Sequence, residues 1–396
     1  MTRHALVSGA SIAGLSAAFW LARTGWEVTV LEKAEAFRDG GQNVDVRGVA
    51  REVLDRMGLF QQVKALNTTE TGTVLVDEHG DVRAELPSDG PDGATAELEV
   101  LRGDLAGAVR DALPSGPDGR VELVFGDTVG TVDETGGGLT VVTEAGREIA
   151  CDLLVVAEGV RSATRDRLFD DVDRHELGID MAFATIPRIE SDDDRWRWFT
   201  TVGGRQVHLR PDNRGTTRAI LAFAPSEHLA TMERDEALAR LRERFADAGW
   251  QAPRVLDGFE ASDDLYVDSL TQIRMPHWHR GRIALAGDAA WCVTPMGGGG
   301  ASLALTGGYV LAAQLAAHPD DHEAALAAYE EWMRPLVDQV QKLPPGVDKI
   351  AYPQTAWGLR LKHVFDKVLT SSLLEPLTKK ITQVADDDRG LPPIPA

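Results

Sequence analysis

Cysteine and long apolar runs are scarce in this sequence. Its 396 residues include two cysteines, Cys151 and Cys292, which are too few and too isolated for a disulfide framework and fit a reducing compartment. No stretch reaches the ~20 clean apolar residues of a membrane span, because the longest one, Ala301–Ala317, contains two glycines and a glutamine. The apolar stretch Ala5–Leu21 lacks a convincing basic leader and runs straight into a β-like segment, unlike a signal peptide. We therefore expect a cytoplasmic protein without a membrane partner.

Lysine is also scarce, whereas acidic residues are abundant. Eight of the 41 basic residues are lysine, and none lies between Lys64 and Lys342. This indicates a bias of genomic base composition and makes a single arginine a weak indicator of function. The formal net charge of −21 disfavours nucleic acid or an anionic membrane surface as a partner. The length exceeds what a single hydrophobic core usually supports, so we expect two closely joined domains.

The pattern of apolar residues separates these two domains. The continuous apolar run Leu153–Ala157 is typical of a buried parallel strand, and Arg282–Ala286 has a similar composition. By contrast, Gln206–Arg210 and Arg218–Ala224 favour long antiparallel strands. We expect one helix over Val49–Leu66 and a small β meander of four strands over residues 121–151. The predicted fold is α/β, with a Rossmann-like domain from residues 1–73, 98–170 and 271–340, an antiparallel-sheet substrate domain from 74–97 and 171–270, and C-terminal helices over 341–396.

The chain opens with a strand, a glycine turn, a helix and a second strand, which is the context of a dinucleotide-binding fingerprint. Gly9 permits the tight turn, Gly14 lets helix and strand pack closely, and Ser11 stands where a third glycine usually lets the backbone approach a diphosphate. The helix N-terminus offers free N–H groups to that diphosphate. Glu32, 18 residues after Gly14, ends the second strand, where it can accept both hydroxyls of an adenosine ribose and would repel a 2′-phosphate. The motif predicts NAD or FAD, held by Gly9, Ser11, Ile12, Ala13, Gly14, Glu32 and Lys33.

A second motif joins a buried strand to a glycine-rich helix start. The strand ends at Asp288, where an acid can reach ligand hydroxyls, and Gly297–Gly300 then offers bare N–H groups to an anion. With Pro295 between them, the run resembles the Gly-Asp-Ala-Ala…Pro…Gly-x-Gly signature of FAD-dependent aromatic hydroxylases, the para-hydroxybenzoate hydroxylase-like family. Within that family it looks most similar to members that act on tetracyclines and other polyketides. Trp291, Gly299 and Ser302 depart from the usual His, Gln and Asn. The resemblance implies that the flavin is held by Asp288, Pro295, Gly298, Gly299, Gly300 and Ala301.

Three further segments bear on the resemblance. Residues 152–165 resemble the family's Ala-Asp-Gly-x-x-Ser-x-x-Arg segment, with Glu158 in place of Asp, which implies a contact with the FAD diphosphate region and with NAD(P)H. Arg102 matches the Arg-x-x-Leu that leads a helix beside FAD. Arg47 lies in the loop where relatives approach the flavin ring, so it either contacts flavin or substrate or pairs with Asp45 or Glu52.

The resemblance also implies a reaction. Non-covalent FAD, reduced by NAD(P)H, would form a C4a-hydroperoxide with O2 and hydroxylate an aromatic or polyketide-like small molecule of secondary metabolism. Because the cofactor carries this chemistry, no protein nucleophile is needed. Trp198, His208 and Phe223 are our candidates for an aromatic substrate pocket. The Trp-x-Trp at Trp196–Trp198 lacks the Ile-Pro of flavin halogenases, which favours strand packing for this segment.

Several alternatives stay open. The same fold supports Baeyer–Villiger oxidation, halogenation and other flavin-dependent redox reactions, and a non-catalytic protein that sequesters flavin or ligand is a further candidate. His277 and His279 lack a third ligand, so no metal is predicted. The family has no separate Rossmann domain for the nicotinamide, so no fingerprint distinguishes NADH from NADPH. We expect a monomer or a weak dimer.

Overall fold

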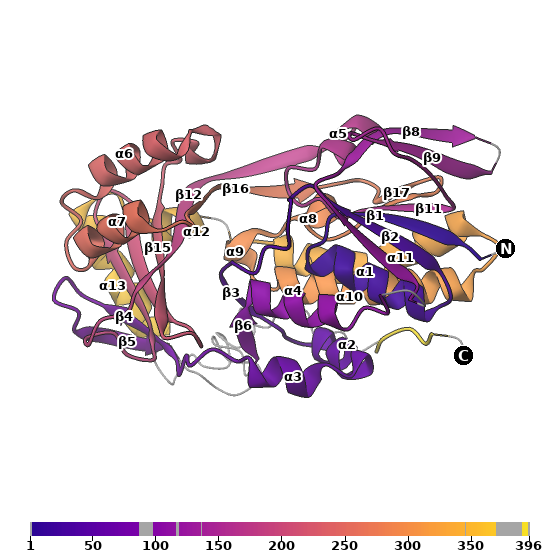
Figure 1. Cartoon of the computed structure of the whole chain (residues 1–396). Coiled ribbons are helices and arrows are strands. Elements are labelled where there is room, and N and C mark those ends of the chain that lie inside the picture. The colour runs from indigo at the N-terminus through magenta and orange to yellow at the C-terminus, as the bar shows by residue number, and fades with distance from the viewer. Residues whose placement is uncertain are drawn as a thin grey trace.

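The computed structural model describes residues 2–86, 98–115, 119–135, 137–344, 346–369 and 390–394, and these residues form two lobes (Figure 1). The expected substrate-domain residues 87–97 and the expected helical residues 370–389 lie outside the described residues. Strands β12 (Asp173–Pro187) and β16 (Tyr266–Arg274) form a long antiparallel ribbon that reaches from one lobe to the other. Both ends of the described chain lie at the first lobe, where the Tyr309 hydroxyl donates to the carbonyl oxygen of Pro392 at 2.7 Å.

A six-stranded sheet forms the core of the first lobe. Its strands run in the order β17-β18-β11-β1-β2-β7 and are parallel except for the edge strand β17. The strand β11 reads Leu-Leu-Val-Val and is buried along its whole length, as a central parallel strand with both faces covered must be. Helix α1 packs against α10 and α4. The bounds are β1 His4–Ser8, β2 Glu27–Glu32, β7 Val121–Phe125, β11 Leu153–Val156, β17 His279–Arg280, β18 Ile283–Leu285, α1 Ile12–Arg23, α4 Arg102–Asp111, α10 Gly300–Ala317 and α11 His322–Gln341.

A seven-stranded sheet forms the core of the second lobe. Its strands run in the order β16-β12-β15-β14-β13-β4-β5, and all its pairs are antiparallel except β13 with β4. Helices α6 and α7 cover one face of this sheet (Figure 1). The bounds are β4 Thr73–Val76, β5 Val82–Leu86, β13 Trp196–Thr201, β14 Arg205–Pro211, β15 Thr216–Phe223, η2 Leu229–Thr231, α6 Arg234–Phe245, α7 Ala252–Ala261, α12 Val347–Ala351 and α13 Ala356–Leu369.

The two faces of this sheet have different neighbours. Leu221 belongs to the apolar cluster that includes Phe245 of α6, whereas the adjacent Ile220 belongs to a cluster that includes Met296 of the first lobe. This alternation follows from the two-residue period of a strand. We call the face opposite α6 and α7 the inner face.

The remaining elements are short. Strands β3 and β6 pair with each other, and β8, β9 and β10 form a three-stranded meander. Helices α8 and α9 follow β18 in sequence and lie near β16. The bounds are β3 Asn43–Asp45, β6 Glu99–Leu101, β8 Val129–Thr135, β9 Gly138–Thr143, β10 Glu148–Cys151, α2 Val49–Met57, α3 Phe60–Ala65, α5 Ala163–Leu168, α8 Asp288–Trp291 and α9 Thr294–Gly297.

Two local expectations are wrong. The single helix expected over Val49–Leu66 is two helices, because Gly58 has a left-handed φ of 78° and ends α2. The expected four-stranded meander has three strands, because β7 pairs in parallel with β2 in the main sheet. The chain reaches β7 from helix α4, and a strand that follows such a crossover joins a parallel sheet. The prediction was wrong because it assumed that β7 pairs with the strands that follow it in the sequence.

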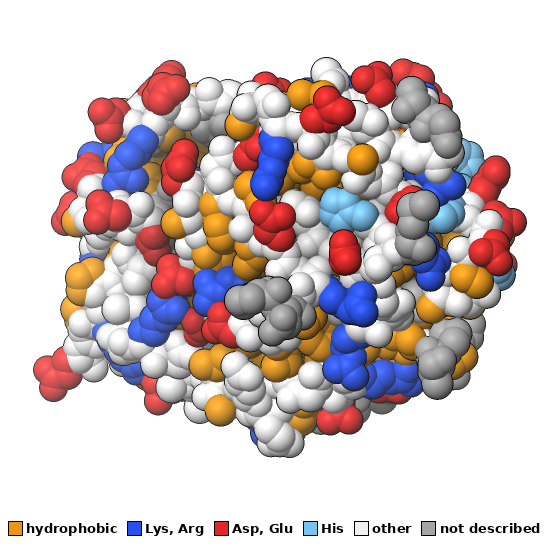
Figure 2. All heavy atoms as spheres, turned by 45° about the vertical axis from the view of Figure 1, so that its right-hand side comes forward, with side chains coloured by type: hydrophobic (Ala, Val, Ile, Leu, Met, Phe, Trp, Pro, Cys, Tyr) orange, Lys and Arg blue, Asp and Glu red, His pale blue; other side chains and the backbone are white. Residues whose placement is uncertain are grey.

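Among the helices that the structure describes, α10 is the one with the length and mean hydropathy (1.3) of a membrane-spanning helix. It is 72% buried inside the protein and packs against α1 and α11, so it is a core helix of the first lobe. On the face of the molecule in Figure 2, acidic and basic side chains are interspersed and apolar side chains gather toward the middle.

Candidate active site

The first glycine turn is built so that only glycine fits at two of its positions. Gly9 has a φ of 107°, and a Cβ added there would lie 2.4 Å from a backbone oxygen. A Cβ at Gly14 would lie 1.9 Å from the Gly9 oxygen. Ser11 is the N-cap of α1, yet within the described chain its side chain caps no N–H group, and the first turn holds no acid. The N–H groups at the start of α1, around Ile12 and Ala13, are therefore available to an anion.

Glu32 is held beside this turn at the end of β2. Its Oε2 accepts the backbone N–H of Ala10 at 2.9 Å, and its Oε1 accepts the N–H of Ala34 at 3.0 Å. Each carboxylate oxygen has a further lone pair, so both remain able to accept ribose hydroxyls. Lys33, which follows, is exposed.

Arg102 and Asp288 lie close enough for their opposite charges to interact. Arg102 begins α4, and its Nη2 donates to the Ser11 hydroxyl at 3.0 Å. Asp288 begins α8, and its side chain is exposed to solvent. Protein atoms nevertheless surround it on most sides. This surrounding protein raises the pKa of Asp288, and the positive charge of Arg102 opposes the rise. Arg102 therefore lies beside the first glycine turn, and the contacts of both side chains with a diphosphate and a ribityl chain stay predictions.

The glycine-rich loop before α10 has a backbone that requires glycine. Gly298 has φ 65° and ψ 179°, and Gly299 has φ 69° as the N-cap of α10. Within the described chain α10 has no side-chain cap and no acid in its first turn. Its N–H groups at Gly300 and Ala301 are therefore available to an anion. Pro295 lies in the short helix α9 just before this loop.

Glu158 is engaged by the protein itself. Its two oxygens accept hydrogen bonds from the hydroxyls of Ser8 at 2.6 Å, Ser162 at 2.7 Å and Thr164 at 2.6 Å, and from the N–H of Thr164 at 3.1 Å. This arrangement ties the end of β1 to the start of α5. A role of Glu158 in cofactor binding stays a prediction, and the structure adds an anchoring role.

Arg47 forms the ion pair that was one of its two expected roles. Its Nη2 lies 2.9 Å from Oδ2 of Asp45. Its backbone N–H donates to the Ser302 hydroxyl at 3.0 Å, and that hydroxyl donates to the carbonyl oxygen of Asp45 at 3.1 Å. These bonds fasten the loop of Arg47 to the first turn of α10. A contact of its guanidinium with flavin or substrate stays a prediction.

An aromatic and apolar row crosses the inner face of the second sheet. The strand registers place one residue from each of six strands side by side. Ring centroids lie 4.5 Å apart for Trp198 and His208 and 6.1 Å apart for Phe183 and Tyr266. We call these residues the aromatic row: Leu75, Trp198, His208, Ile220, Phe183 and Tyr266.

Phe223 does not join this row, which corrects our expectation that it shares a pocket with Trp198 and His208. It belongs to the cluster on the opposite face and lies 6.1 Å from the Phe245 ring of α6. His208 pairs with Ile220, and Phe223 is an odd number of residues further along the same strand. Successive side chains alternate between the faces of a sheet, so Phe223 points toward the helices.

A buried charge cluster, which the sequence analysis did not identify, lies beside the row. The Arg210 guanidinium lies 2.9 Å from Glu70 and 2.8 Å from Glu99, and 4.0 Å above the Trp196 ring. Burial raises the pKa of Glu70 to about 8, against the opposing charge of Arg210. Alternation of Gln206, His208 and Arg210 with apolar residues in β14 is the sequence signal that could have found this polar edge.

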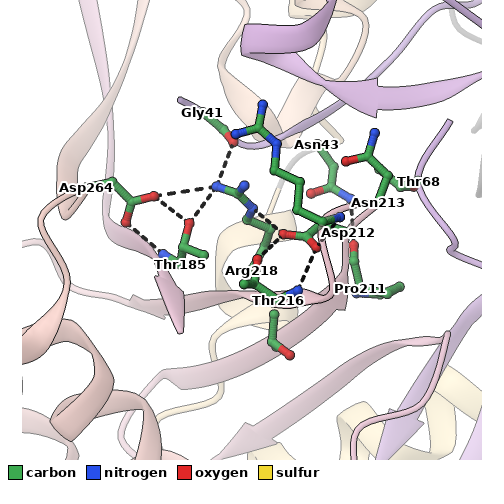
Figure 3. A network of polar contacts seen from close by, with 12 residues as sticks. Gly41, Asn43, Thr68, Thr185, Pro211, Asp212, Asn213, Thr216, Arg218 and Asp264 are labelled. Atoms are coloured by element: carbon green, nitrogen blue, oxygen red, sulfur yellow. Dashed lines mark hydrogen bonds and ion pairs between the residues drawn. The ribbon is translucent and has the colours of Figure 1, made fainter. Parts of the chain in front are cut away.

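A second polar network joins the inner face to the loop that leads to β3 (Figure 3). Arg218 donates to Asp212 at 3.1 Å and to the Thr185 hydroxyl at 2.6 Å, and its Nη1 lies 3.5 Å from the carbonyl oxygen of Gly41. In the same view Asn43 donates to the carbonyl oxygen of Pro211 at 3.3 Å. These bonds hold the two lobes together beside the middle of the aromatic row, because Arg218 lies two residues from Ile220 on β15.

Three other residues lie near Asp288 and were not predicted from the sequence. Arg161 lies 3.4 Å from Asp268. Desolvation by the surrounding protein raises the pKa of Asp268, and it raises that of the half-exposed Tyr266 to about 12, with the negative charge of Asp288 contributing to both. Tyr266 and Asp268 lie on one strand, β16, so this strand joins the aromatic row to the surroundings of Asp288.

A cavity of about 610 Å³ adjoins the glycine-rich loop on the inner face. Met296 of α9 lines it together with Leu177 and Ile179 of β12, Gln272 of β16, the end of α11 and the residues 342–344 that follow it. Its volume lies in the range of small-molecule pockets.

These features together fit FAD. Two helix N-termini without acidic first turns suit a diphosphate and the negatively charged edge of a flavin. Glu32 suits the hydroxyls of the adenosine ribose, and Asp288 suits those of the ribityl chain. A Cβ at Gly9 or Gly14 would obstruct the turn that approaches the diphosphate.

Comparison with known proteins agrees with this geometry. Residues 2–343 match the family described as FAD binding domain. The chain is 33% identical over 392 residues to Monooxygenase CTB7 of Cercospora beticola, covering 93% of this chain and 92% of that protein. It is 32% identical over 356 residues to a flavin-dependent monooxygenase of an unknown prokaryotic organism, covering 86% and 88%.

Solved structures with this fold include flavoproteins. The crystal structure of tetracycline destructase Tet(55) aligns with a TM-score of 0.80 and 27% identity over 100% of this chain and 99% of that one. Klebsiella pneumoniae HpxO, complexed with FAD and uric acid, aligns with a TM-score of 0.75 and 22% identity over 96% of each chain, and at this identity it shows the fold alone. The chain therefore belongs to the FAD binding domain family and is a flavin-dependent monooxygenase.

Proposed function

We propose that the protein uses NAD(P)H and O2 to hydroxylate an aromatic or polyketide-like small molecule. The reaction consumes a substrate C–H bond, NAD(P)H, a proton and O2. One oxygen atom enters the C–H bond, and the other leaves as water together with NAD(P)⁺. Bound FAD supplies the redox chemistry between the nicotinamide and O2. The oxygen-transfer route expected from the resemblance is part of this proposal.

The observation that carries the proposal is the position of the aromatic row relative to the glycine-rich loop. Phe183 and Ile220 of the row belong to one apolar cluster with Met296, which lies two residues before Gly298. A flat ring placed on the row would therefore lie close to the start of α10. Aromatic side chains bind such a ring by stacking and edge contacts, and they exclude water from it. The tetracycline destructases among the structural relatives support a polyketide-like substrate.

The protein groups have separate tasks in this proposal. The N–H groups at Gly300 and Ala301 would stabilise negative charge on the reduced cofactor. Glu32 and Asp288 would fix its ribose and ribityl hydroxyls, and the aromatic row would orient the substrate. The network of Arg218 would keep the two lobes in register.

The test is the rate of NAD(P)H oxidation by the FAD-loaded protein with a panel of phenols and polyketides. We expect at least one ligand to accelerate oxidation and to gain 16 mass units. Incorporation of chlorine would indicate halogenation, and a change of two mass units would indicate another redox reaction. Gain of an oxygen inside a carbon chain or ring would indicate Baeyer–Villiger oxidation. Flavin or ligand binding without any acceleration would indicate the sequestering alternative and contradict the proposal.

We also propose that the protein works in the cytoplasm as a monomer or weak dimer. Cys151 and Cys292 are free and buried, and burial raises the pKa of both thiols, which suits a reducing compartment. Cell fractionation tests the compartment, and light scattering over a concentration series tests the assembly.

A further inference from the structure

Five buried polar side-chain atoms without a hydrogen-bond partner among the described residues lie together at one place. This place is the inner face of the strands β4, β13 and β14, with the segment that precedes β4. Folded proteins pair nearly all such atoms, because an unpaired one is destabilising. The concentration therefore indicates a site where a ligand completes the pairing. Its members are Oε1 of Glu70, Oγ1 of Thr73, Nε1 of Trp196, Nε1 of Trp198 and Nδ1 of His208.

Hydrogen bonds fix which nitrogen of His208 carries the proton. Nε2 of Gln206 donates to the carbonyl oxygen of Ala351 at 2.7 Å. Oε1 of Gln206 then lies 3.1 Å from Nε2 of His208. An amide oxygen can only accept, so Nε2 of His208 carries the proton and Nδ1 bears a lone pair. Nδ1 has no partner among the residues that the structure describes. His208 therefore presents a fixed acceptor within the aromatic row.

This acceptor stays uncharged at neutral pH. Burial lowers the pKa of His208 to about 3, and the positive charges of Arg210 and Lys362 add to the effect. His208 is 3% exposed. A neutral imidazole at this position can accept a hydrogen bond but forms no ion pair. It therefore favours a ligand with a free hydroxyl, which can donate, over the methyl ether of the same ligand, which cannot.

Trp196 and Trp198 present the complementary groups. Their rings stack with centroids 5.4 Å apart and planes 12° apart, and Trp198 contacts the His208 ring. Each indole N–H is buried without an acceptor in the described part of the chain, and an indole N–H can only donate. One acceptor and two donors thus lie on neighbouring strands of one aromatic surface.

We propose that His208 determines substrate specificity by accepting a hydrogen bond from a free phenolic hydroxyl of a flat, multi-ring substrate, while a ring carbonyl of that substrate accepts from Trp196 or Trp198. This inference rests on the proposed function and narrows its substrate class to hydroxylated aromatic ketones. The rings of Trp196, Trp198 and His208 form one surface, with centroids 5.4 Å apart for the two indoles and 4.5 Å apart for Trp198 and His208, which suits several rings better than one.

Binding of matched flavones to the oxidised FAD-loaded protein tests the inference without turnover. The probes are 6-hydroxyflavone and 6-methoxyflavone, which differ at the hydroxyl alone, and equilibrium dialysis gives their affinities. We expect the wild type to prefer the hydroxyflavone by about two- to tenfold, the worth of one net neutral hydrogen bond. His208→Phe keeps a planar ring and removes the acceptor, so the preference should fall to about one while 6-methoxyflavone still binds.

Two other variants keep the test decisive. Gln206→Leu removes the acceptor that keeps the proton on Nε2 of His208, so both tautomers become accessible. The preference for the hydroxyflavone should then be intermediate, which a merely space-filling role of His208 would not predict. His318→Phe changes an exposed histidine at the end of α10 and should keep the wild-type preference. Equal binding of both flavones by the wild type, no binding of either, or an unchanged preference in His208→Phe would overturn the inference. If a panel ligand is hydroxylated while the flavone preference is absent, the proposed function stands and the inference alone fails.

Discussion

Replacing Gly298 by alanine isolates the backbone requirement of the loop before α10. Gly298 has φ 65° and ψ 179°, a region that is essentially restricted to glycine and costs other residues about 1–3 kcal/mol. Gly300 provides the matched control, because a Cβ there would lie 3.6 Å from a methyl group of Val293, an ordinary contact. Alanine is favoured over glycine in a helix by up to about 1 kcal/mol. The free energy of unfolding should therefore fall in Gly298→Ala and stay equal or rise in Gly300→Ala.

The assay is thermal unfolding of the two variants without FAD, because bound cofactor adds its own stabilisation. One kcal/mol shifts Tm by about 2–4 °C in domains of 150–250 residues, so the two variants should differ by at least about 3 °C. FAD dialysis then measures the cofactor separately, and Gly298→Ala should bind FAD more weakly because its loop is displaced at the anion site. Equal Tm values for the two variants would refute the assignment of a strained, glycine-only backbone to Gly298.

Three further predictions concern carboxylates. Glu32→Ala and Asp288→Ala should each weaken FAD binding about ten- to hundredfold in equilibrium dialysis, because each removes charge-assisted hydrogen bonds to hydroxyls; unchanged affinity in both would contradict the cofactor placement. Glu158→Ala should lower Tm by several degrees even without FAD, because three hydroxyls and one N–H lose their acceptor; a Tm equal to that of the wild type would refute its anchoring role. The folded-state pKa of Glu70, about 8, lies above its ordinary value, so the free energy of unfolding should fall as pH rises from 5 to 8.5. Glu70→Gln should reduce this fall in melts across that pH range, and an identical pH dependence would contradict the raised pKa.

The sequence alone was sufficient to predict FAD and the local geometry of the first glycine turn. Glycine is required at positions 9 and 14 because a Cβ there would clash with the oxygen of Ala157 or of Gly9. Glu32 follows in the sequence after one helix and one strand, which brings it back beside the turn. These are short-range conditions, so they can be read along the chain. The apolar run of β11 likewise predicted a central strand, because burial on both faces leaves no polar position.

The residues that share the inner face of the second sheet could be identified only from the tertiary structure. Alternation along β14 separates His208 from its neighbours, but only the hydrogen-bond register with β15 shows that Ile220, and not Phe223, shares its face. Sequence also could not bring Glu70 and Glu99 to Arg210, because these residues lie on segments far apart in the chain. Which residues of one strand share a face follows from local alternation. Which residues of two strands share a face depends on their register, and the pairing of buried charges depends on how distant segments meet in space.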